Sequence, residues 1–189
     1  MPFNFRHLGP PMQSPNIDIS RLQTLCENQW EGNIIPSLEE YIRIPALSPS
    51  FDSNWAENGF IDEAINHIAD WCREQPIEGL QLQTLRLEGR TPLIHMFVPG
   101  QTDEVVLLYQ HADKQPEFVG WHEGLGPWEP VRRGDRLYGR GGADDGYGAY
   151  ASLTAIRAIQ EQGIPHAALH LIVEASEESG SPDLPAYLD

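Results

Sequence analysis

The stretch Val105-Val106-Leu107-Leu108-Tyr109 decides the fold class, because it is apolar at every position and follows a Gly-Gln-Thr-Asp turn. A short, uninterrupted apolar run is typical of a strand buried on both faces, so we expect it to be a central strand of a sheet. A helical pattern follows from about 148 to 162, with Gly163 as its stop, and a second strand is predicted at 168–173. Strand, helix and strand in this order predict a right-handed crossover and an α/β domain with a mainly parallel sheet flanked by helices.

The segment before this unit is predicted to contribute further helices and strands. Apolar residues recur at helical spacing from Ile61 to Cys72, which predicts an amphipathic helix. Pro36 is expected to break the N-terminal helical segment into two helices. The other expected elements are helices at 17–30 and 37–42 and strands at 80–87 and 93–98.

The composition is typical of a globular domain. With 189 residues, of which 40% are hydrophobic and 21% charged, the chain is long enough to bury a core. Residues 1–16 lack the apolar segment of a signal peptide, so we expect a flexible arm ahead of a domain at 17–189. The 2 cysteines form no disulfide framework, which favours a reducing compartment and predicts a cytoplasmic protein.

The charge of the chain argues against two classes of partner. The formal net charge is −16, and the 12 Lys and Arg residues are scattered along the chain. Nucleic acids and anionic membranes are usually bound through a basic patch, so neither is expected as a partner. No segment approaches the roughly 18 consecutive apolar residues of a membrane span. Cations are the expected partners of so acidic a protein.

Polar side chains follow both strands of the crossover unit. His111 and Asp113 come after the first strand, and Glu177 and Glu178 come after the second. In open α/β sheets the functional residues gather at the carboxyl ends of the strands. Two residues apart on an extended chain, His111 and Asp113 would lie on one face, where a carboxylate can orient an imidazole. Two adjacent glutamates on a continuing strand would point to opposite faces and would therefore have different roles.

A glycine-rich segment, Leu137-Tyr138-Gly139-Arg140-Gly141-Gly142-Ala143-Asp144-Asp145-Gly146-Tyr147-Gly148, lies between the two clusters. A dinucleotide-binding loop is the competing interpretation, but Asp144 stands where the third glycine of that motif belongs and would repel a pyrophosphate. The glycines are better suited to presenting Asp144 and Asp145 at the start of a helix, where the helix dipole stabilises ionised carboxylates.

These clusters together predict a metal site. Taken singly, each is also typical of a solvated acidic turn or of an ordinary surface histidine. One histidine and several carboxylates brought to the same sheet edge by separate connections form a ligand set for Zn²⁺ or a similar divalent ion.

Four ordered motifs give the chain a resemblance to the M20 family of metallopeptidases, with the carnosinase-like dipeptidases and glutamate carboxypeptidases as the nearest branch. The resemblance begins near Glu40 and continues to the end of the chain. It implies a zinc-exopeptidase-like catalytic domain that hydrolyses peptide or amide bonds of small substrates such as dipeptides or N-acyl amino acids. The motifs are VLLYQHADKQP at 106–116, WHEGLGPWEP at 121–130, LYGRGGADDGYG at 137–148 and EASEESGS at 174–181.

The resemblance also implies a role for each site residue. His111 would bind one metal ion, Asp144 would bridge two ions and Glu178 would bind the other. Asp113 would hold His111, and Glu177 would be the general base that acts on a metal-bridging water. The two ions are expected to be zinc, with manganese and cobalt as alternatives.

The chain departs from the family pattern at several positions. Ala112, Lys114 and Gly146-Tyr147 replace residues common in the family, and we expect them to affect the pocket lining and the helix entry rather than the ligands. The family also has a further acidic ligand, a C-terminal histidine and a lid or dimerisation domain, none of which this sequence contains. We therefore expect the N-terminal part of a longer catalytic domain, inactive by itself, with a homodimer as a possible state of the full-length protein.

Several alternatives remain open at this level. A non-catalytic metal- or ligand-binding module of the same fold would carry the same motifs. Trp121, His122 and Trp128 either line a substrate entrance or pack in a surface loop. Arg140 could reach a carboxylate of the site or the substrate, or it could pair with an acidic residue of its own loop, Asp135 or Glu129.

Overall fold

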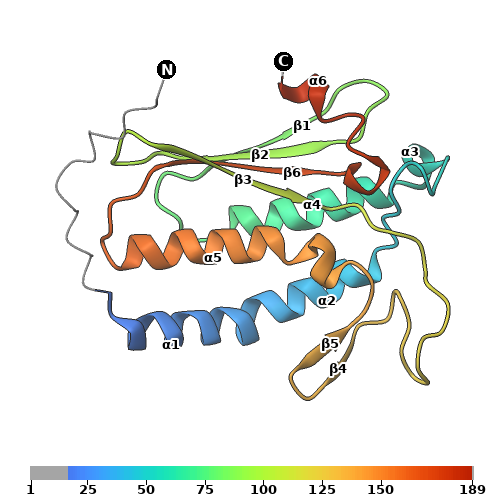
Figure 1. Cartoon of the computed structure of the whole chain (residues 1–189), viewed down its shortest axis with the longest axis horizontal. Coiled ribbons are helices and arrows are strands. Elements are labelled where there is room, and N and C mark those ends of the chain that lie inside the picture. The colour runs from blue at the N-terminus through green and yellow to red at the C-terminus, as the bar shows by residue number, and fades with distance from the viewer. Residues whose placement is uncertain (1–16, 189) are drawn as a thin grey trace, which may run out of the picture.

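The computed structural model describes residues 17–188, so the predicted arm at 1–16 lies outside the described residues. A four-stranded sheet lies on one side of a set of helices (Figure 1). This arrangement confirms the predicted α/β class and the strands expected from the sequence. In sheet order the strands are β1 (Gln81–Leu85), β2 (Leu93–Val98), β6 (Ala168–Glu174) and β3 (Val105–His111).

The described sheet is mixed, which corrects the expectation of a mainly parallel sheet. β3 and β6 are parallel, as the crossover through α5 (Gly148–Glu161) predicts. The β1–β2 and β2–β6 pairs are antiparallel. The crossover pattern is local to β3, α5 and β6, and it carries no information about the direction of strands that enter the sheet by other connections.

β3 is an edge strand of the described sheet, so the expectation that it is central is wrong for the described residues. Val105 and Leu107 are 66% and 59% exposed on the face opposite the long helices, whereas Leu108 packs against the core. An apolar run identifies a strand, but it does not identify the neighbours that the strand will have.

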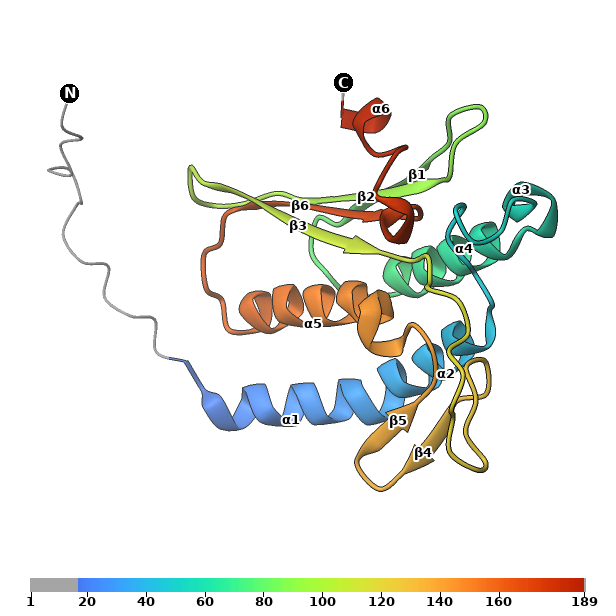
Figure 2. The ribbon, with the colours of Figure 1, turned by 45° about the vertical axis from the view of Figure 1, so that its right-hand side comes forward.

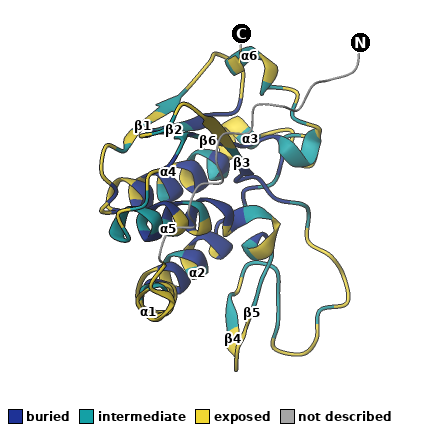
Figure 3. Cartoon of the chain, turned by 60° about the vertical axis from the view of Figure 1, so that its left-hand side comes forward, coloured by how far each residue is buried: buried dark blue, intermediate teal, exposed yellow. Residues whose placement is uncertain are grey.

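The long helices lie on one face of the sheet, and the short α6 (Pro185–Leu188) lies on the other (Figure 1). α4 (Phe60–Arg73) and α5 pack directly beneath the strands, and α1 (Ile19–Gln29) and α2 (Ile35–Arg43) form a layer below them (Figures 1 and 2). Figure 3 shows that the buried residues concentrate between these layers. The amphipathic pattern of α4 is confirmed, since its buried residues are Ile61, Ala64, Ile65, Ile68, Ala69, Trp71 and Cys72. No helix of the described part is both long and apolar enough to cross a membrane.

Pro36 does not break the N-terminal helix, contrary to expectation. A π-helical segment (Trp30–Ile34) joins α1 to α2, and Pro36 lies in the first turn of α2. A proline is tolerated there because its position needs no backbone N–H donor. α2 ends at Arg43, ahead of Pro45 as predicted.

The short elements were not predicted as such. β4 (Val131–Arg133) and β5 (Arg136–Tyr138) form a hairpin inside the segment expected to be a loop. Strands of 3 residues are too short to produce a detectable alternation. The other short elements are α3 (Trp55–Asn58), the turn η2 (Gly142–Gly146), the 3-10 turn η3 (Glu177–Ser179) and α6 (Pro185–Leu188).

Candidate metal centre

Three segments meet at one edge of the sheet. β3 ends at His111 and β6 ends at Glu174, and these two residues are paired neighbours in the parallel ladder. The turn η2 lies between β3 and α5 in the chain, contacts α2 and β3, and carries Asp144. Because β6 stops at Glu174, Glu177 and Glu178 lie on the 3-10 turn η3 and not on a continuing strand.

The predicted metal ligands come together at this edge. His111, Asp144 and Glu178 each offer one ligand atom, and the three atoms lie within 4.8 Å of one another. Nε2 of His111 is 3.2 Å from Oδ1 of Asp144. His111 is buried, Glu178 is half-buried and Asp144 is exposed, so the group is open to solvent on one side. One imidazole and two carboxylates in contact form a donor set that fits Zn²⁺ or a similar divalent ion.

The orientation of the His111 ring favours metal binding through Nε2. Nδ1 lies 3.1 Å from the backbone carbonyl oxygen of Asp113, and a carbonyl can only accept, so Nδ1 carries the donated hydrogen. A neutral ring would then direct the Nε2 lone pair at Asp144, and at Oε2 of Glu177 3.7 Å away. Either a proton or a cation must therefore lie between Nε2 and these carboxylates.

The charges around His111 have the effect expected of such a site. Burial lowers the pKa of His111, but its hydrogen bond to Asp113 and the negative charges of Asp113, Glu177 and Asp145 outweigh burial and raise the pKa to about 9. In the absence of metal, a proton on His111 therefore offsets part of the negative charge of the site.

The carboxylates of the site disfavour one another's ionisation. Burial raises the pKa of Asp145, and the charges of Asp144 and Glu177 add to this effect while His111 opposes it. Burial also raises the pKa of Glu178, with a further contribution from Asp144 and an opposing hydrogen bond from Gln115. A divalent cation would relieve this repulsion.

Asp113 has a second set of contacts that the sequence did not reveal. Its side chain is 0% exposed, and its Oδ1 lies 3.5 Å from Nδ1 of His111. The same carboxylate accepts the backbone N–H groups of Glu177 and Glu178, at 3.1 and 3.0 Å. It therefore fixes the position of the turn η3 relative to His111. No motif signals this contact, because its donors are main-chain groups.

Glu174 anchors the other side of the same turn, and it was not singled out from the sequence. Its buried carboxylate accepts hydrogen bonds from the hydroxyl groups of Tyr109, at 2.5 Å, Ser181, at 2.6 Å, and Ser176, at 3.1 Å. The sequence does contain a signal for these contacts. Ser176 and Ser181 stand on either side of the turn η3 and close to Glu174 in sequence, and their hydroxyl groups can donate to its carboxylate.

The loop residues for which the sequence left two interpretations open make different contacts. Trp121 and His122 help to line a hollow of about 260 Å³, whereas Trp128 donates its ring N–H to Glu117.

The guanidinium of Arg140 donates to the carbonyl oxygen of Pro116 and stacks on Phe118, with 4.1 Å between the guanidinium carbon and the ring centroid. In the described structure these contacts take the place of the acidic partners considered for Arg140.

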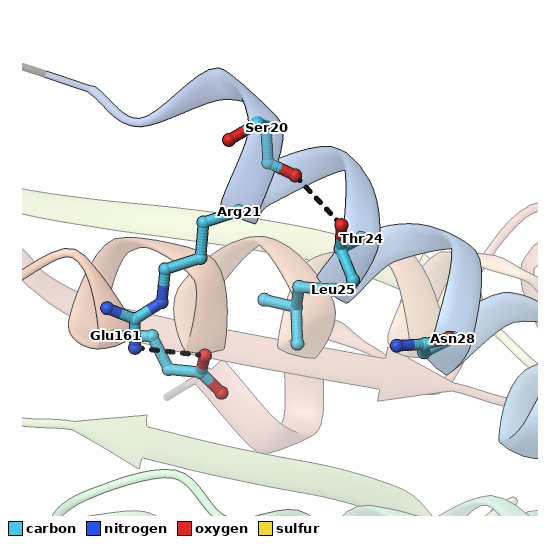
Figure 4. A pocket seen from close by; sticks show the side chains of 6 residues that line it. All are labelled: Ser20, Arg21, Thr24, Leu25, Asn28 and Glu161. Carbon is cyan, nitrogen blue, oxygen red and sulfur yellow. Dashed lines mark hydrogen bonds and ion pairs between the residues drawn. The ribbon is translucent and has the colours of Figure 1, made fainter.

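A larger hollow lies away from the candidate metal centre, between α1 and α5 (Figure 4). Its volume is about 370 Å³, and Arg21 and Glu161 form an ion pair of 3.6 Å across it. Both side chains are partly exposed, so this is a surface depression between two helices. It contains none of the residues predicted to bind metal.

Comparison with known proteins connects this site to a family. The model of Peptidase family M20/M25/M40 matches residues 107–189, which include every residue of the candidate centre. A cysteinylglycine-S-conjugate dipeptidase of Corynebacterium striatum is 37% identical over 136 residues, covering 69% of this chain and 30% of that protein. An uncharacterised metallohydrolase of Methanocaldococcus jannaschii is 28% identical over 147 residues, covering 75% of this chain and 36% of that protein.

The fold is also that of a solved dipeptidase. Human carnosine dipeptidase 1 superimposes with a TM-score of 0.69 at 21% identity, over 88% of this chain and 36% of that one. The chain thus spans about a third of the length of the relatives that it matches. The matched segment contains the three converging candidate ligands and both glutamates of the turn, and residues 107–189 of this chain match the model of peptidase family M20/M25/M40.

Proposed function

We propose that this chain forms part of a metal-dependent hydrolase that cleaves the peptide or amide bond of small substrates such as dipeptides or N-acyl amino acids. The observation that carries the proposal is the convergence of His111, Asp144 and Glu178 within 4.8 Å at the carboxyl edge of the sheet. The family of residues 107–189 and the dipeptidase from Corynebacterium striatum support peptide hydrolysis as the reaction class.

The three ligand side chains would hold two divalent ions, for which zinc is our first expectation. His111 and Glu178 would each bind one ion, and the exposed carboxylate of Asp144 would be shared between them. When bound, the ions would supply Lewis-acid chemistry that activates a water molecule and polarises the scissile carbonyl.

Glu177 is the proposed general base. Its side chain is 40% exposed and its Oε2 lies 3.7 Å from Nε2 of His111, so its carboxylate faces the site and remains open to solvent. It would accept the proton of the attacking water and return this proton to the leaving amine as the C–N bond breaks. The proposed role of Asp113 is to hold His111 and the turn η3 in register while this occurs.

We also propose that the catalytic domain extends beyond the segment described. The matched part covers only 36% and 30% of the two curated relatives, and the exposed apolar side chains of β3 are suited to packing against further structure. Three ligand side chains also leave each of two ions short of a complete protein ligand set. Purified alone, the 189-residue chain is expected to bind divalent ions weakly and to show no peptidase activity. Peptidase turnover at a normal rate by the isolated chain would contradict this part of the proposal.

Metal content and turnover of the complete protein test the function together. We expect bound divalent metal by mass spectrometry and hydrolysis of dipeptides or N-acyl amino acids that stops on chelation and resumes when metal is restored. His111→Ala should lose both metal and activity, whereas His122→Ala, in the exposed loop, should keep the metal content. Metal binding with no hydrolysis across both substrate classes would favour the alternative, a non-catalytic binding module of the same fold.

A further inference from the structure

Lys114 is a buried lysine next to the candidate centre, three residues after His111. Its side chain is 0% exposed, and backbone carbonyl oxygens are its hydrogen-bond acceptors. Its Nζ donates to the carbonyl of Tyr41 at 2.6 Å, to that of Ile44 at 2.6 Å and, more weakly, to that of Ile42 at 3.5 Å. From the sequence we expected this departure from the family pattern to affect the pocket lining, but the structure places Lys114 in the interior.

The carbonyls that Lys114 contacts are those at the C-terminus of α2. This helix ends at Arg43, and the carbonyls at the end of a helix carry the negative end of its dipole. An ammonium group offers three donors and suits such a site. The Nζ atom also lies 3.9 Å from the centroid of the Tyr41 ring, which adds a cation–π contact.

The aliphatic part of Lys114 contacts the glycine-rich segment. A Cβ atom placed on Gly141 would lie 2.7, 2.8 and 2.9 Å from three carbons of the Lys114 side chain. Gly141 also has a positive φ of 80°, and it immediately precedes the turn η2 that carries Asp144. The Lys114 side chain and the loop therefore pack without room for any larger residue at Gly141.

The backbone of Lys114 forms a third connection. Its N–H donates to the carbonyl of Ala46 at 2.9 Å, and its carbonyl accepts the N–H of Ser48 at 3.0 Å. One residue thus contacts the end of α2, the chain that follows α2 and the loop leading to Asp144, while it continues the segment that carries His111 and Asp113.

We propose that Lys114 is a positioning residue that sets the spacing between His111 and Asp144 by joining the end of α2, the end of β3 and the glycine-rich loop. The inference rests on the proposed function, since it concerns how two of the proposed metal ligands are held. Lys114 itself touches no ligand in this arrangement.

The test compares Lys114→Met with Ile68→Ala in the complete protein. Methionine keeps most of the length and apolar character of the side chain but removes the three donors. Ile68 is buried on the core face of α4 and is not among the hydrogen-bond partners of Lys114, so its truncation lowers stability while it leaves those hydrogen bonds in place. The readouts are affinity for Co²⁺ by titration, the visible spectrum of bound Co²⁺ and the melting temperature of each metal-free variant.

We expect Lys114→Met to weaken Co²⁺ binding about 10- to 100-fold and to alter the spectrum, as loss of a group supporting the ligands does. Ile68→Ala should lower the melting temperature while leaving the affinity and the spectrum unchanged. Wild-type affinity and spectrum in Lys114→Met would overturn the positioning role. If the wild-type protein itself fails to bind Co²⁺, the proposed metal-dependent function is wrong. This outcome differs from wild-type binding by Lys114→Met, which would overturn only the positioning role.

A second variant covers the case in which Lys114→Met does not fold. Gly141→Ala keeps the ammonium and pushes on the Lys114 side chain from the loop side. We expect it to weaken Co²⁺ binding as well, because the added methyl group changes the spacing between His111 and Asp144 from the side of the loop. A folded Gly141→Ala protein with unchanged affinity and spectrum would contradict the proposal.

Discussion

The carboxylate of Asp113 accepts the backbone N–H of Glu178 at 3.0 Å, across 65 residues of sequence. Its other oxygen accepts the N–H of Glu177 at 3.1 Å. The segment after β3 therefore holds in place the turn that follows β6, and the two proposed roles of that turn depend on a residue that is itself fully buried.

Replacing Asp113 with asparagine tests this connection. The amide nitrogen cannot accept a hydrogen bond, so one of the two N–H groups of η3 loses its partner in a buried place. We expect a loss of about 1–3 kcal/mol in the free energy of unfolding of the metal-free protein, measured with urea. Asp103→Asn, at an exposed turn, is the matched control and should change stability by less than about 0.5 kcal/mol. Equal effects of the two substitutions would show that the hydrogen bonds between Asp113 and the turn η3 contribute nothing to stability.

The hydroxyl groups around Glu174 make a second prediction. Tyr109→Phe removes one of the three donors and should cost about 0.5–1.5 kcal/mol in the free energy of unfolding. Glu174→Gln disturbs acceptors for all three hydroxyls at once and should cost more than Tyr109→Phe. If Tyr109→Phe proves the more damaging of the two, Glu174 is not the anchor of this turn.

The two cysteines are predicted to differ in reactivity. Cys26 is exposed on α1, whereas Cys72 is buried in α4, where burial raises the pKa of its thiol to about 12. The thiolate is the reactive form, so iodoacetamide should modify Cys26 in the native protein and leave Cys72 untouched until urea unfolds it. Mass spectrometry of the alkylated peptides gives the answer, and rapid native labelling of Cys72 would contradict the packing of α4 described above.

Much of the fold could be predicted because its signals are local. The periodicity of α4 and the apolar runs of β2 and β6 determine these elements within a residue or two of their observed bounds. The position of β3 at the edge could not be predicted, since it depends on which strands pair with β6. The helical path through Pro36 also escaped prediction, because a π-helical segment can absorb a proline that would end a regular helix.

The candidate site, like the fold, could be predicted only in part. His111, Asp144 and Glu178 follow strands or glycine-rich turns in the sequence, and the parallel pairing of β3 with β6 explains why strand ends meet. The contacts of Asp113 with two main-chain N–H groups and of Lys114 with main-chain carbonyls could not be predicted. Nearly every residue type has a main-chain N–H and carbonyl, so the sequence does not show which residues supply these partners.

Glu177 and Glu178 are proposed to have different roles, as general base and as metal ligand. Metal content and steady-state kinetics of Glu177→Gln and Glu178→Gln in the complete protein distinguish these roles. Glu178→Gln should lose metal and activity, with partial recovery in excess metal, because an anionic ligand is gone. Glu177→Gln should keep its metal and its KM while kcat falls by about 10²–10⁴-fold, because glutamine cannot accept the proton. Loss of metal in Glu177→Gln with full retention in Glu178→Gln would show that the roles are reversed, and unchanged metal and activity in both would contradict the account of this site.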